Sequence, residues 1–307
     1  MFPFSIYEAR RKRLRLLKPP LLKPPRTPPG VCMVWAMVAK LLLVGAGKMG
    51  EALLVGLFAS GWARPAEVVV NEVSEPRRAQ LAANAQLAGA RVTGGDLVAA
   101  EGVVIAVKPA DVEAVCRRLA ELFGKGDEVR VLSVAAGVHV AELETWCGPS
   151  ARVVRAMPNL PAVMGAAATA IAGGPRSTRE DVSWARELMS GVGIVEEVPE
   201  ALLDVVTGLS GSGPAYLFLV VEAMTEAGVL LGLPRQVASK LVAQTLLGAG
   251  RLLVETGQSP QDLRAAVTSP GGTTAAALRE LERNGVRSAF IEAVAASAAR
   301  SRELSGA

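Results

Sequence analysis

The chain has 307 residues, of which half are apolar and 20% are charged, and its mean hydropathy is +0.34. This length predicts one large domain or two of ordinary size. The single histidine, His139, excludes zinc sites built on two or more histidines and argues against triad chemistry. The three cysteines, Cys32, Cys116 and Cys147, are scattered and include no C-x-x-C pair. We therefore expect a cytoplasmic protein with neither a disulfide framework nor a metal site.

The net charge of +4 is unevenly distributed along the chain. Residues 1–40 carry nine Lys or Arg and one acid, so they hold a charge of +8 and leave −4 on the remainder. A nucleic-acid partner would require a basic face on that remainder, and we therefore expect none.

Seven of the 19 prolines lie in residues 1–30, most of them in "LKPPLLKPPRTPPG". Proline at this density prevents regular helix and sheet, so residues 1–37 are predicted to form a disordered, basic tail. Two interpretations stay open, a targeting or membrane-surface arm and an upstream start codon with Met37 opening the natural chain; we favour the second. The apolar run 31–39 is similar to a signal sequence, but Lys40 and a strand leading into a glycine loop follow it, so secretion is not expected.

From residue 40 onward, apolar β-type runs alternate with Ala/Leu-rich helical stretches. The runs lack strict alternation of apolar and polar residues, as is typical of strands buried on both faces of a parallel sheet. Strands are predicted over residues 40–45, 67–70, 90–93, 102–108, 128–134, 151–157, 167–173 and 193–198, with a helix beginning near Thr178. This order predicts an α/β fold whose N-terminal Rossmann-type, doubly wound sheet occupies residues 38–198.

After Pro199 the β signal ends, and an all-α domain is predicted over residues 199–307. Its helices are expected near residues 200–207, 213–231, 234–256, 260–267, 273–284 and 286–303. The run "PAYLFLVV" (214–221) is strongly apolar, but Glu222 and Glu226 follow it, so no membrane span is expected. A helix that is apolar around most of its circumference buries more than one face, which predicts an obligate homodimer through this domain.

The sequence "GAGKMG" places Gly45, Gly47 and Gly50 in the G-x-G-x-x-G spacing. It follows a predicted strand and opens the apolar helix "EALLVGLFASG", which is the context that supports dinucleotide binding. Gly45 permits the tight turn, Gly47 lets the backbone approach a pyrophosphate, and Gly50 permits close packing of helix on strand. The N–H groups at the start of the helix would bind the pyrophosphate.

Residues after three further strands are expected at the same edge of the sheet, because ligands bind beyond the carboxyl ends of parallel strands. Asn71 and Glu72 end the second strand, and Arg77 and Arg78 follow. An acid there takes the ribose 2′-OH of NAD, whereas a polar residue with a nearby Arg suits a 2′-phosphate, and Glu72 is equally compatible with a solvated loop. The segments "AVKP" (106–109) and "VAAGV" (134–138) complete this edge, although a strand-terminal Lys is often simply solvated.

Two loops in the helical half, "TGLSGSGPAY" (207–216) and "TSPGGTTAA" (268–276), place Gly and Ser or Thr immediately before a helix. Such a loop directs several backbone N–H groups at an anion, or it simply caps its helix. The hydroxyls of Thr273 and Thr274 would donate hydrogen bonds to a substrate without carrying charge.

Together these motifs resemble pyrroline-5-carboxylate reductase, from about Val38 to about Glu303. The most specific parts are "VTGLSGSGPAY" (206–216) and "VTSPGGTTAAAL" (267–278), supported by "AVKP" and "RAMPNLPA" (155–162). The resemblance implies reduction of the cyclic imine 1-pyrroline-5-carboxylate to L-proline, the last step of proline biosynthesis, with hydride from NADPH or alternatively NADH. Related cyclic imine reductases and a non-catalytic nucleotide-binding protein are the alternatives.

The resemblance also implies the roles of individual residues. It places the substrate carboxylate on the Ser269–Thr274 backbone, assigns the Thr274 hydroxyl to the ring nitrogen, and puts Glu200 beside the substrate. The catalytic candidates are thus Thr274 and Lys108, and the substrate-binding candidates are Glu200, Ser269, Gly271, Gly272, Thr273 and Thr274. The cofactor-binding candidates are Gly45, Ala46, Gly47, Lys48, Met49, Gly50, Asn71, Glu72, Thr93, Ala106, Val107, Lys108, Pro109, Ala135, Ala136 and Gly137.

The family forms dimers through interleaved helical domains, commonly assembled into rings of five dimers, with substrate loops that come partly from the partner. Three positions depart from the family pattern. Thr93 and Ala266 each replace an Asn that relatives use near the cofactor, and Glu72 replaces a small polar residue. These departures leave the choice between NADPH and NADH open.

Overall fold

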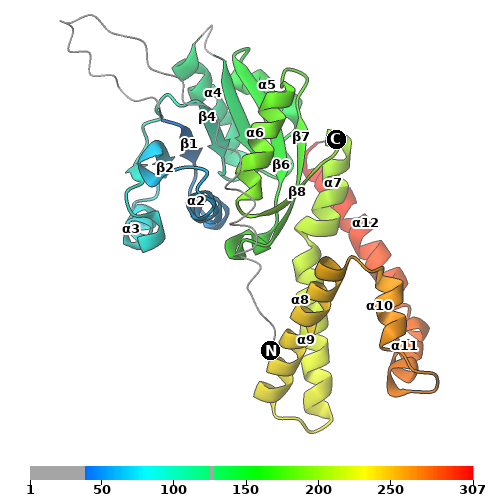
Figure 1. The fold of residues 1–307 in the computed structure, drawn as a ribbon. Coiled ribbons are helices and arrows are strands. Elements are labelled where there is room, and N and C mark those ends of the chain that lie inside the picture. Colours follow the sequence, from blue (N-terminus) through cyan, green and yellow to red (C-terminus); the bar gives the residue numbers. More distant parts are fainter. Residues whose placement is uncertain (1–38, 125–127, 307) are drawn as a thin grey trace, which may run out of the picture. The chain divides into compact units, whose positions relative to one another are not determined.

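The computed structural model describes residues 39–306 apart from residues 125–127 (Figure 1). The predictions made for the tail, residues 1–37, lie outside the described residues. We call residues 39–197 the sheet region and residues 200–306 the helical region.

The sheet region contains one eight-stranded sheet with the order β3-β2-β1-β4-β5-β6-β7-β8. All neighbouring strands are parallel except β6 and β7. The order reverses between β1 and β4, which confirms the predicted doubly wound sheet and places its switch point there. The strands are β1 (Leu41–Val44), β2 (Val68–Asn71), β3 (Arg91–Thr93), β4 (Gly102–Ile105), β5 (Val129–Ser133), β6 (Ala151–Met157), β7 (Ala167–Gly173) and β8 (Gly193–Glu197).

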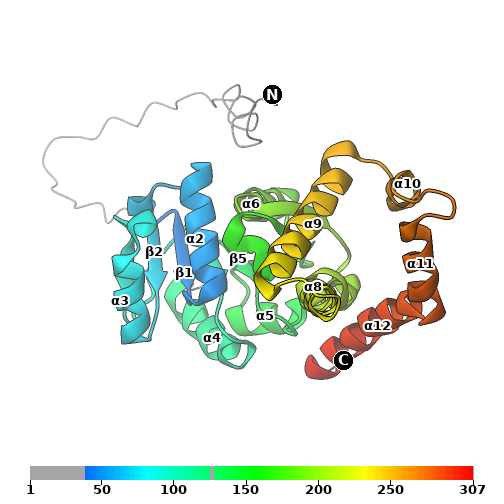
Figure 2. The same cartoon turned by 90° about the horizontal axis from the view of Figure 1, so that it is seen from below.

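Helices cover both faces of this sheet (Figure 2). They are α2 (Lys48–Ser60), α3 (Glu75–Ala83), α4 (Val112–Phe123), α5 (Val140–Cys147) and α6 (Arg179–Ser190). Along β1, Leu41 and Leu43 pack into the core with α2 and α6, whereas Leu42 packs into the core with α4 and α5. A strand with a core on each side has no polar face, which explains the continuous apolar runs in the sequence.

The antiparallel strand β7 is the one element whose direction the sequence did not predict. Only a short 3₁₀ segment, Leu160–Met164, connects β6 to β7. A parallel pair needs a crossover of a dozen or more residues, so this connection is too short and the chain returns antiparallel. The next connection contains α6, and β8 is again parallel to β7.

The helical region contains the six expected helical segments, in the expected order. They are a 3₁₀ turn (Glu200–Leu202) leading into α7 (Leu203–Val206), then α8 (Gly213–Leu230), α9 (Arg235–Thr256), α10 (Pro260–Ala266), α11 (Thr273–Arg283) and α12 (Val286–Leu304). The predicted boundary between two domains near residue 198 follows the end of β8 at Glu197 and stays a prediction.

The expectation of an open loop at residues 207–216 is wrong. Thr207–Gly211 forms a π-helical turn that leads into α8. The hydroxyls of Thr207 and Ser210 donate to the carbonyls of Leu203 and Val206 at 2.9 and 3.3 Å, so they serve the helix itself. A Cβ on Gly208 would lie 2.6 Å from the carbonyl oxygen of Val294 in α12, so this glycine permits close helix packing.

Helices α8 and α9 bury almost nothing within one chain. The buried residues are Thr225 in α8 and Ala238 in α9, while Leu230 and Val254 are 85% and 84% exposed. By length and composition alone, Glu200–Leu230 and Arg235–Thr256 are apolar enough to cross a membrane. Glu222 and Glu226 therefore do not exclude an apolar stretch of this length, contrary to expectation, and the exposed apolar surface requires a partner that covers it.

Candidate functional site

The glycine loop after β1 has the geometry of a phosphate-binding turn. Gly45 has φ +88°, and a Cβ there would lie 2.7 Å from Val107 Cγ1. A Cβ on Gly50 would overlap the carbonyl oxygen of Gly45, so both positions require glycine. No side chain caps the N-terminus of α2, and a Cβ on Gly47 would point into open space. The free N–H groups and the space beside them fit the pyrophosphate of a dinucleotide.

Glu72, at the end of β2, is tied to this loop. Its side chain is buried, Oε2 accepts the N–H of Ala46 at 2.9 Å, and Oε1 accepts the N–H of Ser74 at 2.8 Å. Of the alternatives for this residue, a solvated loop position is therefore wrong, because both oxygens bind backbone. The carboxylate lies where the adenosine ribose of a dinucleotide is held in Rossmann-type sheets.

Two arginines flank Glu72. Arg77 Nε donates to the carbonyl of Ala46 at 2.7 Å, and its Nη2 pairs with Glu51 Oε2 at 2.5 Å. The hydrogen bond from Arg77 holds the pKa of Glu51 below its usual value. Arg78 Nη1 donates to the carbonyls of Glu72 and Val73 at 3.0 and 2.8 Å. The buried carboxylate of Glu72 thus lies against the glycine loop, and Arg77 and Arg78 bind backbone carbonyls of this loop and of the turn after β2.

The remaining cofactor candidates lie at the same edge of the sheet. Asn71 pairs in register with Thr93, and its Nδ2 donates to Thr93 Oγ1 at 3.3 Å. Lys108 is exposed just after β4, and Ala106 and Val107 contact the space beside Gly45. After β5, Ala135 is buried, Ala136 is exposed and Gly137 has φ +74°. The structure therefore brings together the residues that follow β1, β2, β3, β4 and β5.

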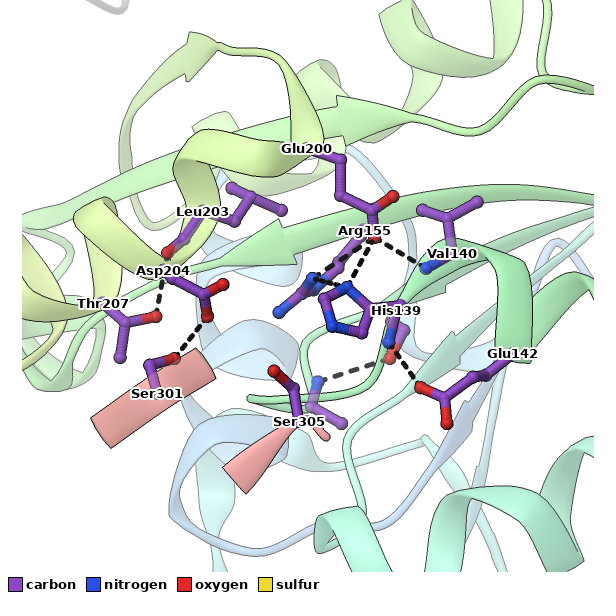
Figure 3. A network of polar contacts seen from close by, with 12 residues as sticks. His139, Val140, Glu142, Arg155, Glu200, Leu203, Asp204, Thr207, Ser301 and Ser305 are labelled. Atoms are coloured by element: carbon purple, nitrogen blue, oxygen red, sulfur yellow. Dashed lines mark hydrogen bonds and ion pairs between the residues drawn. The ribbon is translucent and has the colours of Figure 1, made fainter. Parts of the chain in front are cut away.

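Glu200 lies in a polar network where the helical region begins (Figure 3). Its Oε1 accepts the N–H of Val140 at 2.7 Å and Nη1 of Arg155 at 3.2 Å. His139 Nδ1 lies 3.6 Å from the same oxygen. Sequence reasoning missed Arg155 as a site residue; the signal was a positive charge within the apolar strand "ARVVRAM".

Of the second predicted loop, residues 268–276, the part 268–272 lies outside any helix, and α11 begins at Thr273. Gly271 has φ +68°, the N–H of Gly272 donates to the carbonyl of Ser269 at 3.0 Å, and no side chain caps α11. Thr274 is half-buried in the first turn of this helix. The free N–H groups of α11 fit a carboxylate.

One chain does not bring this loop to the glycine loop. Helix α10 packs against α9 and α11 packs against α12. Both helices lie away from the sheet in the two views of the fold (Figures 1 and 2). The cofactor candidates and the Ser269–Thr274 candidates therefore form two separate groups within a single chain.

Comparison with known proteins gives a family match in each region. The sequence model of the family "Pyrroline-5-carboxylate reductase dimerisation" matches residues 200–304, and that of "NADP oxidoreductase coenzyme F420-dependent" matches residues 40–137. The chain is 43% identical to the pyrroline-5-carboxylate reductase of Synechocystis over 271 residues, covering 87% of this chain and 99% of that protein. It belongs to the pyrroline-5-carboxylate reductase family.

Other reductases of this family agree in sequence and fold. The enzyme of Pisum sativum is 40% identical over 265 residues, covering 85% of this chain and 94% of that protein. The structure of the reductase from Coxiella burnetii matches with a TM-score of 0.80 and 37% identity, covering 87% of this chain and 98% of that one. The Plasmodium falciparum reductase, whose structure has NADP bound, matches with a TM-score of 0.74 and 26% identity, covering 87% and 98%.

Proposed function

We propose that this protein reduces 1-pyrroline-5-carboxylate to L-proline with NADPH as the hydride donor and NADH as an alternative, the last step of proline biosynthesis. The observation that carries the proposal is the likeness to curated reductases over nearly their whole length, at 40–43% identity. The residues that this chain offers a dinucleotide and a carboxylate support it.

NAD(P)H, when bound, supplies the hydride that reduces the imine carbon. The N-terminus of α2 would hold the pyrophosphate, and Glu72 and the neighbouring Arg78, which bind the backbone of this turn, would hold the adenosine ribose and any phosphate on it. Ala136 and Gly137, with the buried Ala135 behind them, would offer small residues to the nicotinamide. Lys108 and Pro109 would contact the cofactor beside the glycine loop.

The helical region holds the substrate. The free N–H groups of Thr273 and Thr274, at the start of α11, bind the substrate carboxylate. The Thr274 hydroxyl donates to the ring nitrogen and assists its protonation, while Ser269, Gly271 and Gly272 shape the loop. The imine carbon is already electrophilic, so catalysis consists mainly of positioning the ring against the nicotinamide.

The assembly completes the site in this proposal. The family model that covers residues 200–304 describes a dimerisation region, and the exposed apolar residues of α8 and α9 provide the surface for a homodimer. The Ser269–Thr274 loop of one chain then serves the cofactor cleft of its partner. We further propose that five such dimers form a ring. The two described cysteines, Cys116 and Cys147, are free thiols, in keeping with a cytoplasmic location.

The test is oxidation of NADPH and NADH, followed in parallel at 340 nm on adding racemic pyrroline-5-carboxylate to the purified protein. We expect turnover with both cofactors and formation of one proline for each cofactor oxidised. A six-membered cyclic imine carboxylate is the comparison substrate, because one ring CH₂ changes binding by about 1–3 kcal/mol. A higher kcat/KM for the six-membered ring, or no turnover while NADPH still binds, would contradict the proposal.

A further inference from the structure

A buried arginine in the middle of the sheet has no part in the reaction as described above. Arg155 lies in β6, in register with Ser133 of β5 and Ala172 of β7, and is 2% exposed. Burying a guanidinium is costly unless its charge is paired. Its Nη1 lies 3.2 Å from Glu200 Oε1 and 3.4 Å from His139 Nδ1. The buried charge is therefore directed at the first residue of the helical region.

Glu200 is held at one of its two carboxylate oxygens. Oε1 accepts both Arg155 Nη1 and the N–H of Val140. Val140 is the first residue of α5, so the positive end of that helix adds to the attraction. No hydrogen bond from a residue in the described part of the chain reaches Oε2. Figure 3 shows this second oxygen pointing away from Arg155.

The network lies beside the cofactor candidates that follow β5. His139 and Val140 end the loop that begins with Ala135, Ala136 and Gly137. A Cβ on Gly137 would lie 3.9 Å from Ser305, just after α12. Three segments distant in sequence therefore meet here, and the Glu200 side chain remains 30% exposed among them.

We propose that Arg155 is a positioning residue for the reduction. Together with the N–H of Val140 it fixes Oε1 of Glu200, so that the negative charge of the carboxylate is held beside the substrate ring. The inference rests on the proposed function and on the predicted place of Glu200 beside the substrate. A fixed carboxylate favours the cationic imine over the neutral one, and the cation is the better hydride acceptor.

The test is a double-mutant cycle with Arg155→Met and Glu200→Gln. Methionine replaces a buried charge by an apolar side chain of similar length, and the double variant removes both charges of the pair, a change that folded proteins often tolerate. With NADPH saturating, we expect each single variant to raise the KM for pyrroline-5-carboxylate about tenfold or more, while the Kd for NADPH changes less than twofold. The double variant should be no worse than either single one, because the two side chains act as one unit.

The matched control is Arg186→Met. Arg186 Nη2 pairs with Glu197 Oε2 at 3.3 Å, three residues before Glu200, but this pair is exposed. We expect its KM and kcat to stay within twofold of the wild type, since exposed ion pairs contribute little.

Three outcomes would overturn the positioning role. The first is a KM and kcat of Arg155→Met equal to those of a wild type that reduces the substrate. The second is a double variant whose loss of activity is the product of the two single losses. The third is a loss of activity in each variant that is explained by the amount of folded protein alone. If Arg155→Met does not fold, Arg155→Lys replaces it, and the inference then requires a KM between those of the wild type and Glu200→Gln. A wild type without pyrroline-5-carboxylate turnover would instead contradict the proposed function.

Discussion

The two regions of the chain differ in what they bury. In the sheet region every residue of β1, β2 and β4 is buried, and helices enclose a core on each face. In the helical region α8 and α9 together span Gly213–Thr256, yet the buried residues of these two helices are Thr225 and Ala238. The sheet region buries its apolar surface within one chain, whereas the helical region requires a second copy to bury the apolar surface of α8 and α9.

The same division applies to the two groups of site residues. The cofactor candidates lie on the self-contained sheet, and the Ser269–Thr274 loop lies on helices that need a partner. Substitutions in the helical region should therefore change assembly or turnover while cofactor binding persists. Substitutions at the cofactor candidates of the sheet region should change cofactor binding while the dimer persists.

The largest effect is expected from charging the exposed apolar surface of the helices. Leu219 in α8 is 66% exposed and Leu247 in α9 is 55% exposed. Burying an unpaired carboxylate at each position of an interface costs about 3–5 kcal/mol, so Leu219→Glu with Leu247→Glu should abolish the dimer at micromolar concentration. Light scattering should show a monomer, turnover should fall at least about 100-fold, and NADPH binding should remain.

The control for this double variant is Leu122→Glu, at a 39% exposed leucine of α4 in the sheet region. It should leave the mass of the assembly unchanged. A monomeric Leu219→Glu/Leu247→Glu protein that retains full turnover would show that one chain holds a complete site.

The next largest effect is expected at Thr274, the half-buried threonine in the first turn of α11. Thr274→Ala removes the hydroxyl proposed to assist protonation of the ring nitrogen, and kcat should fall about 100-fold or more. The dimer and the Kd for NADPH should stay as in the wild type. Thr145→Ala, which removes an exposed hydroxyl that donates to the Ala141 carbonyl at 2.7 Å in α5, is the matched control. An unchanged kcat would remove Thr274 from the mechanism.

Much of the difference between the sheet region and the helical region could be predicted from the sequence, because the spacing of apolar residues and of glycines is a local signal. The strands and helices follow from continuous apolar runs and Ala/Leu-rich stretches, and Gly45 and Gly50 follow from their spacing. The π-helical turn at Thr207–Gly211 could not be predicted, because Gly208 contacts α12, which lies some 90 residues later in the chain.

The polar network around Glu200 could not be predicted from local sequence signals either. Arg155 pairs with Glu200 across 45 residues, and only the sheet topology places β6 against the start of the helical region. The same holds for Glu72, whose hydrogen bond to the N–H of Ala46 joins residues 26 positions apart. The local sequence pattern predicts helices and strands, whereas a pair of side chains distant in sequence can be identified only once the fold is known.

A moderate effect, confined to the sheet region, is expected at Glu72. If Glu72 holds the adenosine ribose as proposed, its carboxylate would repel a 2′-phosphate, so Glu72→Ser should raise the ratio of kcat/KM with NADPH to kcat/KM with NADH about tenfold. Glu75→Ser, in the first turn of α3, changes the same charge at an exposed site and should leave the ratio unchanged. The dimer should persist in both variants. A ratio that falls in Glu72→Ser would mean that this carboxylate favours NADPH.

The smallest effect is expected from the pair of Glu51 and Arg77, which lies within the sheet region. The hydrogen bond from Arg77 lowers the pKa of Glu51 in the folded protein. A lowered pKa contributes stability above the ordinary carboxyl range, and this contribution is lost as the pH falls through the folded value. Because both side chains are partly exposed, at 22% and 29%, the contribution is about 1 kcal/mol or less.

Arg77→Met should therefore lower the free energy of unfolding by up to about 1 kcal/mol at pH 7, and the difference from the wild type should shrink toward pH 3. Urea unfolding of the two proteins between pH 7 and pH 3 measures this difference. The exposed pair of Arg117 and Glu113 in α4 supplies the control, since Arg117→Met should show a smaller difference. A stability difference for Arg77→Met that grows as the pH falls would mean that Arg77 acts through its carbonyl contact with Ala46 rather than through Glu51. The glycine loop would then depend directly on this arginine, and NADPH binding should weaken in the same variant.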